Sequence, residues 1–236
     1  MGLIDSEIER IRNTYSKRDI SHIGKRYSWN CPDVQFTQYR IKHVISRLFV
    51  DLGWYDLKDI NTLDIGCGNG SWLRNLQEWG VSASALHGID ILSDRIEAAL
   101  RLSPHIDFRV ASGWSLPFED NSFNLISAHT VFSSILDSRA RLELANEIVR
   151  LLKPEGMILL YDFRIRNPRN ADTLGINKNE VERLFPNMPL KIKSLTLAPP
   201  IQRPLARVSP LLVHIIEALI PLLRTHCVYC LVNRND

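Results

Sequence analysis

Three observations predict an α/β fold in which helices cover both faces of a mostly parallel sheet. Short apolar runs alternate with stretches of helical periodicity across residues 60–163, as they do in right-handed βαβ units. The runs are apolar throughout rather than at every second position, which is typical of strands buried on both faces. A glycine-rich turn at residues 66–70 joins the first run to the first helical stretch, and open α/β sheets bind ligands at such junctions.

The first 55 residues predict helices that precede the sheet. Apolar residues recur at helical spacing in residues 4–18 and again in 34–53, where Gly53 is a stop signal. The aromatic residues of this part either close over a pocket or simply pack on the sheet; they include Tyr15, Tyr27, Trp29 and Tyr39. We therefore expect an N-terminal helical lid at residues 1–55 and a ligand-binding α/β domain at residues 56–236.

The elements of the second domain follow in a regular order. Strands are expected at 61–66, 85–90, 106–111, 123–129 and 156–163, with helices near 71–79, 93–102 and 138–152. A short helix around 178–185 and two further strands, 190–198 and 227–233, complete the pattern. Cys227 and Cys230 lie in the last strand on opposite faces, so we interpret them as packed cysteines rather than a metal or redox motif. No metal site is predicted.

The composition is that of a globular protein, with 45% hydrophobic and 23% charged residues in 236. It excludes a disordered or low-complexity chain. A net charge of +3 is too small to indicate a nucleic-acid partner. The N-terminus is charged and lacks the apolar run of a signal peptide, and no stretch reaches the roughly 20 apolar residues of a membrane span. These features predict a cytoplasmic protein.

The strongest functional signal is the string LDIGCGNG at residues 63–70. A glycine turn lets a ligand approach the backbone, and the helix that follows offers free N–H groups. The dinucleotide fingerprint is excluded because Ser71 stands where its last glycine belongs. The next strand ends at Asp90, 24 residues after Gly66. A carboxylate at this place binds both ribose hydroxyls of a nucleotide-type ligand, or merely caps the following helix.

Two further strings, SLPFEDNSFNLI at 115–126 and EIVRLLKPEG at 147–156, complete a pattern that resembles class I S-adenosylmethionine-dependent methyltransferases. The resemblance implies a Rossmann-like sheet of seven strands with an antiparallel last strand, and S-adenosylmethionine as cofactor. Ser112 departs from the family, which often has an acidic residue there. The implied cofactor-binding residues are Asp64, Gly66, Cys67, Gly68 and Gly70 at the methionine part, Asp90 and Ile91 at the ribose, Ser112, Gly113 and Trp114 at the adenine, and His129 and Thr130 at the sulfonium.

Two residues are candidate catalytic bases, because they follow the fourth and fifth strands at the ligand-binding edge of the sheet. They are His129 and Asp162. A hydroxyl acceptor needs its proton removed, whereas an activated carbon or an amine needs no base. The alternatives are a histidine that only forms the cofactor wall and an aspartate that only pairs with Arg164 or Arg166.

The strings YDFR at 161–164 and LTLAPP at 195–200 resemble a subgroup associated with surface-glycan and natural-product assembly. This resemblance implies O-methylation of a sugar, a glycan or a phosphorylated glycan intermediate. The candidate substrate-binding residues are Tyr27, Arg40, Tyr161, Arg164 and Arg203. One alternative is a quinone or another lipophilic small molecule, which a pocket without arginines would favour. A second alternative is a cofactor-binding subunit without activity, since Ser112 and the absence of histidine at 133–134 depart from the family.

The apolar stretch 208–223 lies between the last two strands, within an expected cap insertion at 199–225. One helix is predicted here, with Pro210 in its first turn and Pro221 at its end. Three interpretations remain open: a substrate cap, the interface of a homodimer, and a helix that lies on a membrane surface. Arg203, Arg207 and Arg224 flank the stretch and favour the last interpretation, which would make the protein peripheral to the membrane.

Overall fold

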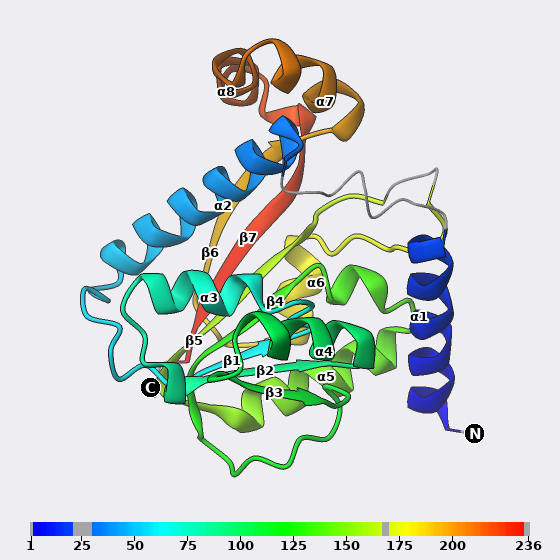
Figure 1. Cartoon of the computed structure of the whole chain (residues 1–236), viewed down its shortest axis with the longest axis vertical. Coiled ribbons are helices and arrows are strands. Elements are labelled where there is room, and N and C mark those ends of the chain that lie inside the picture. Colours follow the sequence, from blue (N-terminus) through cyan, green and yellow to red (C-terminus); the bar gives the residue numbers. More distant parts are fainter. Residues whose placement is uncertain (1, 21–29, 167–169, 234–236) are drawn as a thin grey trace.

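The computed structural model describes residues 2–20, 30–166 and 170–233 of the chain. One sheet has the strand order β3-β2-β1-β4-β5-β7-β6 (Figure 1). Strands β1 to β5 are mutually parallel, and β7 is antiparallel to both of its neighbours. The predicted seven-stranded, mostly parallel sheet with an antiparallel last strand is confirmed. The strands are β1 (Thr62–Ile65), β2 (Leu86–Asp90), β3 (Asp107–Val110), β4 (Phe123–His129), β5 (Leu152–Phe163), β6 (Leu190–Leu197) and β7 (Arg224–Val232).

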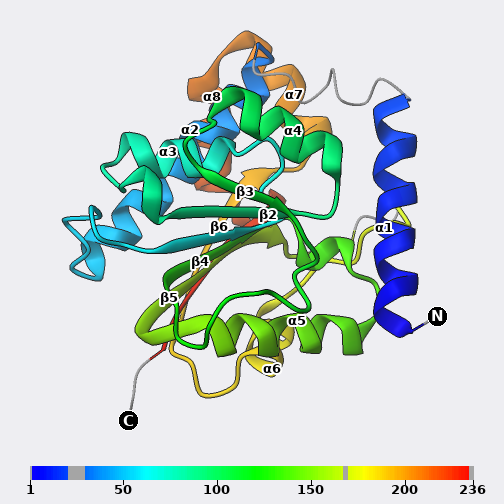
Figure 2. The same ribbon diagram turned by 60° about the horizontal axis from the view of Figure 1, so that its bottom comes forward.

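Helices cover both faces of the sheet, as predicted (Figure 2). One hydrophobic cluster includes Leu144 and Ile148 of α5 and Val181 of α6. The cluster on the other face includes Ile45 of α2 and Leu73 of α3. The helices are α1 (Leu3–Ile20), α2 (Pro32–Asp51), α3 (Ser71–Glu78), α4 (Ser93–Leu102), α5 (Ser138–Leu151), α6 (Lys178–Leu184), α7 (Pro199–Val208) and α8 (Pro210–Leu219), with 3-10 turns η2 (Ala83–Ala85), η3 (Phe132–Ser134) and η4 (Pro221–Leu223).

The two cysteines of β7 lie on opposite faces of the sheet. Both thiols are free and buried. Cys227 belongs to the cluster with α5 and α6, and Cys230 to the cluster with α2 and α3. This is the period-two alternation of a strand, and it confirms the interpretation of packed cysteines.

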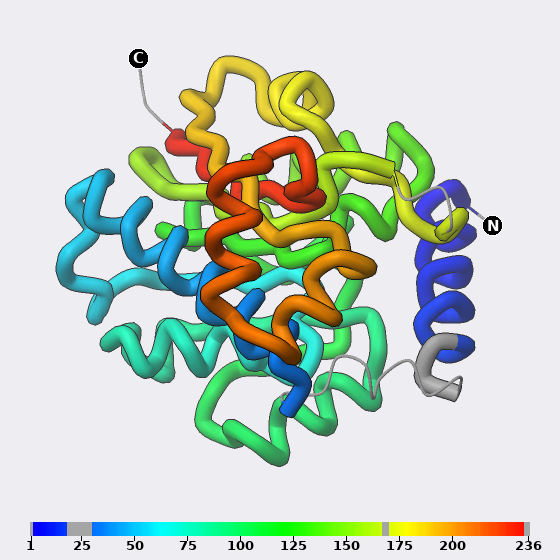
Figure 3. Tube along the Cα trace, turned by 90° about the horizontal axis from the view of Figure 1, so that it is seen from above, coloured from blue at the N-terminus to red at the C-terminus, as the bar shows by residue number. Residues whose placement is uncertain are grey.

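The connection between β6 and β7 contains two helices, where the sequence predicted one. We call residues 199–223, which comprise α7, α8 and η4, the cap. Pro210 opens α8, and Ser209 before it is extended, with φ −162° and ψ 122°. Because a proline disfavours helical backbone at the preceding residue, the apolar stretch 208–223 cannot continue as one helix through Ser209. The cap lies at one end of the molecule, beside the N-terminal half of α2 (Figures 1 and 3). In the described part of the chain, no helix is both long and apolar enough to cross a bilayer.

A buried carboxylate attaches the cap to the sheet. Glu217 of α8 is 1% exposed, and its Oε2 accepts a hydrogen bond from Arg40 Nε of α2 at 2.9 Å. Its Oε1 accepts from the backbone N–H of Thr196 at 2.5 Å. Thr196 has φ +65°, and the β6–β7 register passes from Leu195 to Leu197 without it. Glu217 therefore satisfies a donor that the irregular strand leaves outside the ladder.

We predict that Glu217→Ala destabilises the fold by about 3 kcal/mol, because it leaves a partly buried guanidinium and a buried N–H without their acceptor. Glu217→Gln keeps an oxygen for Thr196 and should cost less. Urea unfolding monitored by circular dichroism measures both changes. Glu182→Ala is the matched control, since Glu182 forms an exposed ion pair with Lys178 and should cost under about 0.5 kcal/mol. Equal losses for Glu217→Ala and Glu182→Ala would contradict the attachment.

Candidate active site

A cavity lies at the carboxyl ends of β1, β2 and β4, as predicted for this sheet. One of its walls is α1, which stands beside the domain (Figures 1 and 2). The lining residues come from α1, from the segments after β1 to β4, and from α4 and α5. They are Ile11, Tyr15, Ile65, Gly66, Ile89, Asp90, Ile91, Leu92, Arg95, Ala111, Gly113, Trp114, His129, Thr130, Val131, Ser134, Ile135 and Leu144.

The glycine turn at the floor of the cavity has a backbone that other residues rarely adopt. Gly66, Gly68 and Gly70 have φ values of +68°, +55° and +77°. A Cβ on Gly66 would lie 2.7 Å from Val131 Cγ2, and one on Gly70 would lie 2.4 Å from Phe108 Cζ. The turn needs glycine for its conformation at all three positions and for its packing at two.

Asp90, the last residue of the neighbouring strand β2, fixes the conformation of this turn through a hydrogen bond. Its Oδ2 accepts a hydrogen bond from the N–H of Gly68 at 3.0 Å, and its Oδ1 accepts from the N–H of Leu92 at 3.0 Å. Burial raises the pKa of Asp90, and these two hydrogen bonds partly offset the shift. Each oxygen keeps a second lone pair, and Asp90 lines the cavity. Asp90 thus fixes the backbone before α4 without capping that helix, whose N-cap is Leu92. Its binding to ribose hydroxyls stays a prediction.

The far end of the cavity is an apolar slot. The indole of Trp114 donates from Nε1 to the carbonyl of Ala140 in α5 at 2.7 Å. A Cβ on Gly113 would lie 2.8 Å from Leu144 Cδ1, so only glycine lets the chain pass this close to α5. The lining residues Ala111, Gly113, Trp114 and Leu144 offer an apolar surface on which a planar ring can pack.

The sequence of this region matches a known family. A family described as "Methyltransferase domain" matches residues 62–156, which include the glycine turn, Asp90, Trp114 and His129. Residues 62–156 are therefore similar in sequence to a methyltransferase domain, and the chain shares its fold with solved S-adenosylmethionine-dependent methyltransferases.

A curated protein with a similar sequence is a quinone methyltransferase by name. The chain is 28% identical over 138 residues to "Demethylmenaquinone methyltransferase" of Lactococcus lactis subsp. lactis (strain IL1403), covering 56% of this chain and 51% of that protein. The chain thus spans about half the length of that curated relative.

Two solved structures share the fold at 16% identity. N-methyltransferase NodS of Bradyrhizobium japonicum WM9, in complex with S-adenosyl-L-homocysteine, has a TM-score of 0.63 and covers 89% of this chain and 91% of its own. Geranyl diphosphate C-methyltransferase of Streptomyces coelicolor A3(2) has a TM-score of 0.60 and covers 82% and 78%.

Several residues expected to bind the cofactor do not line the cavity. The residues that do not line it are Asp64, Cys67, Gly68, Gly70 and Ser112. Asp64 is 2% exposed and accepts from Ser127 Oγ at 2.7 Å. Burial raises the pKa of Asp64 to about 7. Burial also raises the pKa of the Cys67 thiol, so this cysteine is a packed, protonated group at neutral pH.

His129 lines the cavity in a form that makes it a weak base. Its ring packs on Trp72 at a centroid distance of 4.9 Å and on the edge of Tyr161 at 6.0 Å. Its Nε2 is buried without a hydrogen-bond partner among the described residues. Burial lowers the pKa of His129 to about 4, so the ring is neutral at pH 7. A base this weak has little driving force for taking a proton from a hydroxyl group.

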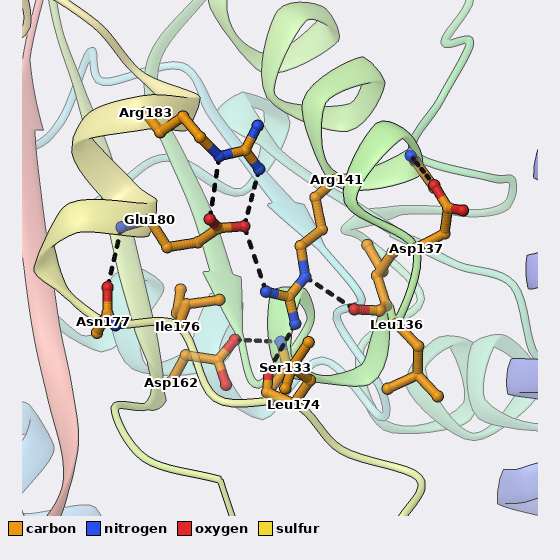
Figure 4. Close-up of polar contacts among 12 residues, drawn as sticks. Ser133, Leu136, Asp137, Arg141, Asp162, Leu174, Ile176, Asn177, Glu180 and Arg183 are labelled. Atoms are coloured by element: carbon orange, nitrogen blue, oxygen red, sulfur yellow. Dashed lines mark hydrogen bonds and ion pairs between the residues drawn. The ribbon is translucent and has the colours of Figure 1, made fainter.

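Asp162, the other candidate base, lies outside the cavity in a buried cluster beneath η3 (Figure 4). Its Oδ2 accepts from the N–H of Ser133 at 3.0 Å, and its Oδ1 accepts from the N–H of Phe163 at 2.8 Å. Arg141 in the same cluster donates to the carbonyls of Ile135 at 2.8 Å and Leu174 at 2.6 Å. These contacts favour a structural role, because they tie η3, which borders the cavity, to the segment after β5.

Among the residues expected to bind the acceptor, those that the structure describes do not line the cavity. Arg40 pairs with Glu217, and Arg203 lies 3.6 Å from Asp33 of α2. The remaining described candidates also contact protein: Arg164 Nε donates to the Arg224 carbonyl at 2.8 Å, and the Tyr161 hydroxyl lies 2.9 Å from Thr196 Oγ1. Tyr27 lies outside the described residues. The pairing of Asp162 with Arg164 or Arg166 is not seen; its oxygens accept backbone N–H groups instead.

The helix α1 contributes to the cavity one residue, Ile11, that the sequence did not predict there. Ile11 and Tyr15 line it from one face of α1, as their spacing of four permits, but only Tyr15 was considered. The Tyr15 hydroxyl lies 3.1 Å from Ser134 Oγ, and the Arg95 guanidinium lies 4.9 Å from the centre of the Tyr15 ring. Glu7 holds α1 in place by accepting from the N–H of Leu136 at 2.6 Å.

We predict that Gly70→Ala destabilises the domain by about 3 kcal/mol or more, since it adds a steric clash to an unfavourable φ. Phe108 cannot move away easily, because its ring also fills the space over Gly88. Gly68→Ala is the matched control. It has the same strained φ, but its Cβ would meet nothing closer than 3.9 Å, so about 1–2 kcal/mol is expected. Urea unfolding compares the two, and equal losses would contradict the steric argument.

Asp162→Asn tests the burial of its carboxyl group. Burial raises the pKa of Asp162 to about 6, above its value in the unfolded chain, so folding takes up a proton between about pH 4 and pH 6. The wild type therefore loses stability as the pH rises through this window. Asparagine does not titrate, and the variant should gain about 2–3 kcal/mol relative to wild type between pH 4 and pH 7. A difference in unfolding free energy that stays constant over this range would contradict the prediction.

Proposed function

We propose that the protein transfers the methyl group of S-adenosylmethionine to a lipophilic small molecule of the quinone type. The observation that carries this proposal is the engagement of the described candidate arginines in protein contacts. Arg40, Arg164 and Arg203 each bind a carboxylate or a carbonyl of the chain itself. A sugar phosphate needs such donors free, whereas a quinone ring needs mainly apolar surface.

The proposal assigns the cavity to the cofactor, whose sulfonium methyl is an activated electrophile when bound. Gly66 and the glycine turn would contact the methionine part, and Asp90 would accept hydrogen bonds from the ribose hydroxyls. Gly113 and Trp114 would hold the adenine in the apolar slot. His129 and Thr130 would close the sulfonium side. Gly68 and Gly70 would contribute through the backbone shape rather than through contact.

The chain's own contribution to the reaction would be orientation and the exclusion of water. Correct alignment of the reacting atoms can supply about 7–11 kcal/mol of a barrier. A neutral His129 beside the cavity supports an acceptor that needs no strong base, such as an activated ring carbon. The similarity to a relative named as a demethylmenaquinone methyltransferase also supports this acceptor class. O-methylation of a glycan is the weaker candidate, because it requires both free donors and a base.

Transfer of labelled methyl groups tests the acceptor class. We expect label in reduced naphthoquinones and none in nucleotide sugars or phosphorylated glycans. Label only in the sugar fractions would overturn the acceptor. Transfer to none of these acceptors, with cofactor binding intact, would favour the cofactor-binding subunit without activity.

Cofactor binding is measured separately by thermal shift with S-adenosylhomocysteine. Asp90→Ala should weaken binding about tenfold to a hundredfold, because it removes charge-assisted hydrogen bonds to the ribose. Asp94→Ala is the matched control, since Asp94 is exposed on α4 and does not line the cavity. Equal affinity of the Asp90→Ala variant and wild type would contradict the assignment.

A further inference from the structure

The cap presents an apolar surface to solvent. Seven of the sixteen large apolar side chains that are exposed in the described part of the chain belong to its 25 residues. They are Val208, Leu211, Leu212, Ile215, Leu219, Ile220 and Leu222, exposed by 41% to 84%. Exposed apolar side chains are ordinary when scattered, but a cluster of this kind marks a surface that something covers.

The helix α8 differs from a normal surface helix. Its buried residues are Val213 and Glu217, which face the protein. The outer side, where a surface helix usually carries charged residues, has Leu211, Ile215 and Leu219, and only His214 is polar among its exposed residues. With ten residues, α8 is far too short to span a bilayer. It is suited to lie flat in an interface between water and an apolar phase.

The exposed arginine of the cap that forms no ion pair with a described residue is Arg207, and the cap has no exposed carboxylate of its own. Glu217 is the only acidic residue of the cap, and it is buried against Arg40. The cap therefore offers a cation beside apolar side chains and no exposed carboxylate, which complements a surface with negative charge.

We propose that the cap docks on an anionic lipid bilayer, with the apolar side chains of α8 and η4 inserted and Arg207 at the level of the head groups. A second copy of the chain fits less well, because a two-fold interface places the same patch on itself and would oppose the cationic groups of both copies.

The position of the cap relates this docking to the cavity. The cap joins β6 and β7 at Leu197 and Arg224, which are paired in the sheet. Phe163 at the end of β5 pairs with His226 of β7, and His129 of the cavity pairs with Tyr161 of β5. All of these residues lie at the same end of the sheet, where β4, β5 and β6 have their carboxyl ends. Docking would turn this end of the sheet toward the membrane, from which a lipophilic acceptor would arrive. The delivery of an acceptor rests on the proposed function, whereas the docking itself does not.

Sedimentation with vesicles of equal parts phosphatidylcholine and phosphatidylglycerol tests the proposal. We expect wild type to bind these vesicles, and to bind pure phosphatidylcholine vesicles more weakly. The triple variant Leu211→Ser, Leu219→Ser, Leu222→Ser should lose about tenfold or more in partitioning, because it removes the inserted side chains. Arg207→Glu, a single exposed change that leaves the fold intact, should lose about fivefold or more and only on the anionic vesicles.

Leu102→Ser is the matched control, because Leu102 is 59% exposed on α4, which packs at the β3 edge of the sheet, away from the cap on β6. It should bind vesicles as wild type does. Wild type that stays in the supernatant with anionic vesicles would overturn the proposal, as would equal binding by wild type and the cap variants. So would a wild-type dimer in sedimentation velocity that the triple variant converts to monomer.

Failure of the docking can be told from failure of the proposed function. The cap variants should keep the wild-type affinity for S-adenosylhomocysteine and the wild-type rate on a short-chain, water-soluble quinol. Vesicle binding without methyl transfer to any quinol would leave the docking in place and reject the acceptor.

Discussion

The site depends on one constraint, the left-handed backbone of the glycine turn after β1. Three residues with positive φ in five positions cannot be held by local preference alone, because glycine is also the residue with most freedom to leave such a conformation. The hydrogen bond from Gly68 to Asp90 and the one from Cys67 to the carbonyl of Ile89 fix the turn to β2. The parallel pairing of β1 and β2 is therefore what holds the cavity floor in shape.

The opposite wall depends on η3 in a similar way. Its Ser133 donates to Asp162 of β5 and accepts from the N–H of Leu174, while Ser134 contacts Tyr15 of α1. One short turn thus joins the end of β5, the segment before α6 and the N-terminal helix. Because buried polar groups are costly when unpaired, a shift of any of these elements would disturb the others. Together with the apolar contacts of Ile4, Ile11 and Tyr15, this arrangement gives α1 a defined place against the cavity.

The sequence predicted the parts of the molecule whose signals are local. The parallel strands could be predicted because strand and helix patterns alternate along the chain, and Gly66 and Asp90 could be placed at the ends of their strands from the same local pattern. The roles of Arg40 and Asp162 could not be predicted in this way. The partner of Arg40 is 177 residues away, and Asp162 meets Ser133 from 29 residues away, so only the folded chain shows that these groups are occupied. The start of α8 at Pro210 could be predicted from the proline, whereas α7, which contains Pro204 in its interior, could not.

In the cap, one buried charge provides an attachment to the sheet that leaves the outer apolar side chains exposed. A helix whose outer side is apolar gains little from packing against its own protein, since most of its apolar area faces away. Glu217 supplies an attachment that does not depend on that area, through Arg40 on one side and Thr196 on the other. If the cap were held by its leucines, they would be unavailable to any partner. Because this anchor and an inward-facing apolar cluster that includes Ala206 and Val213 hold the cap, the exposed Leu211, Leu219 and Leu222 remain available to a lipid surface without loosening the sheet below.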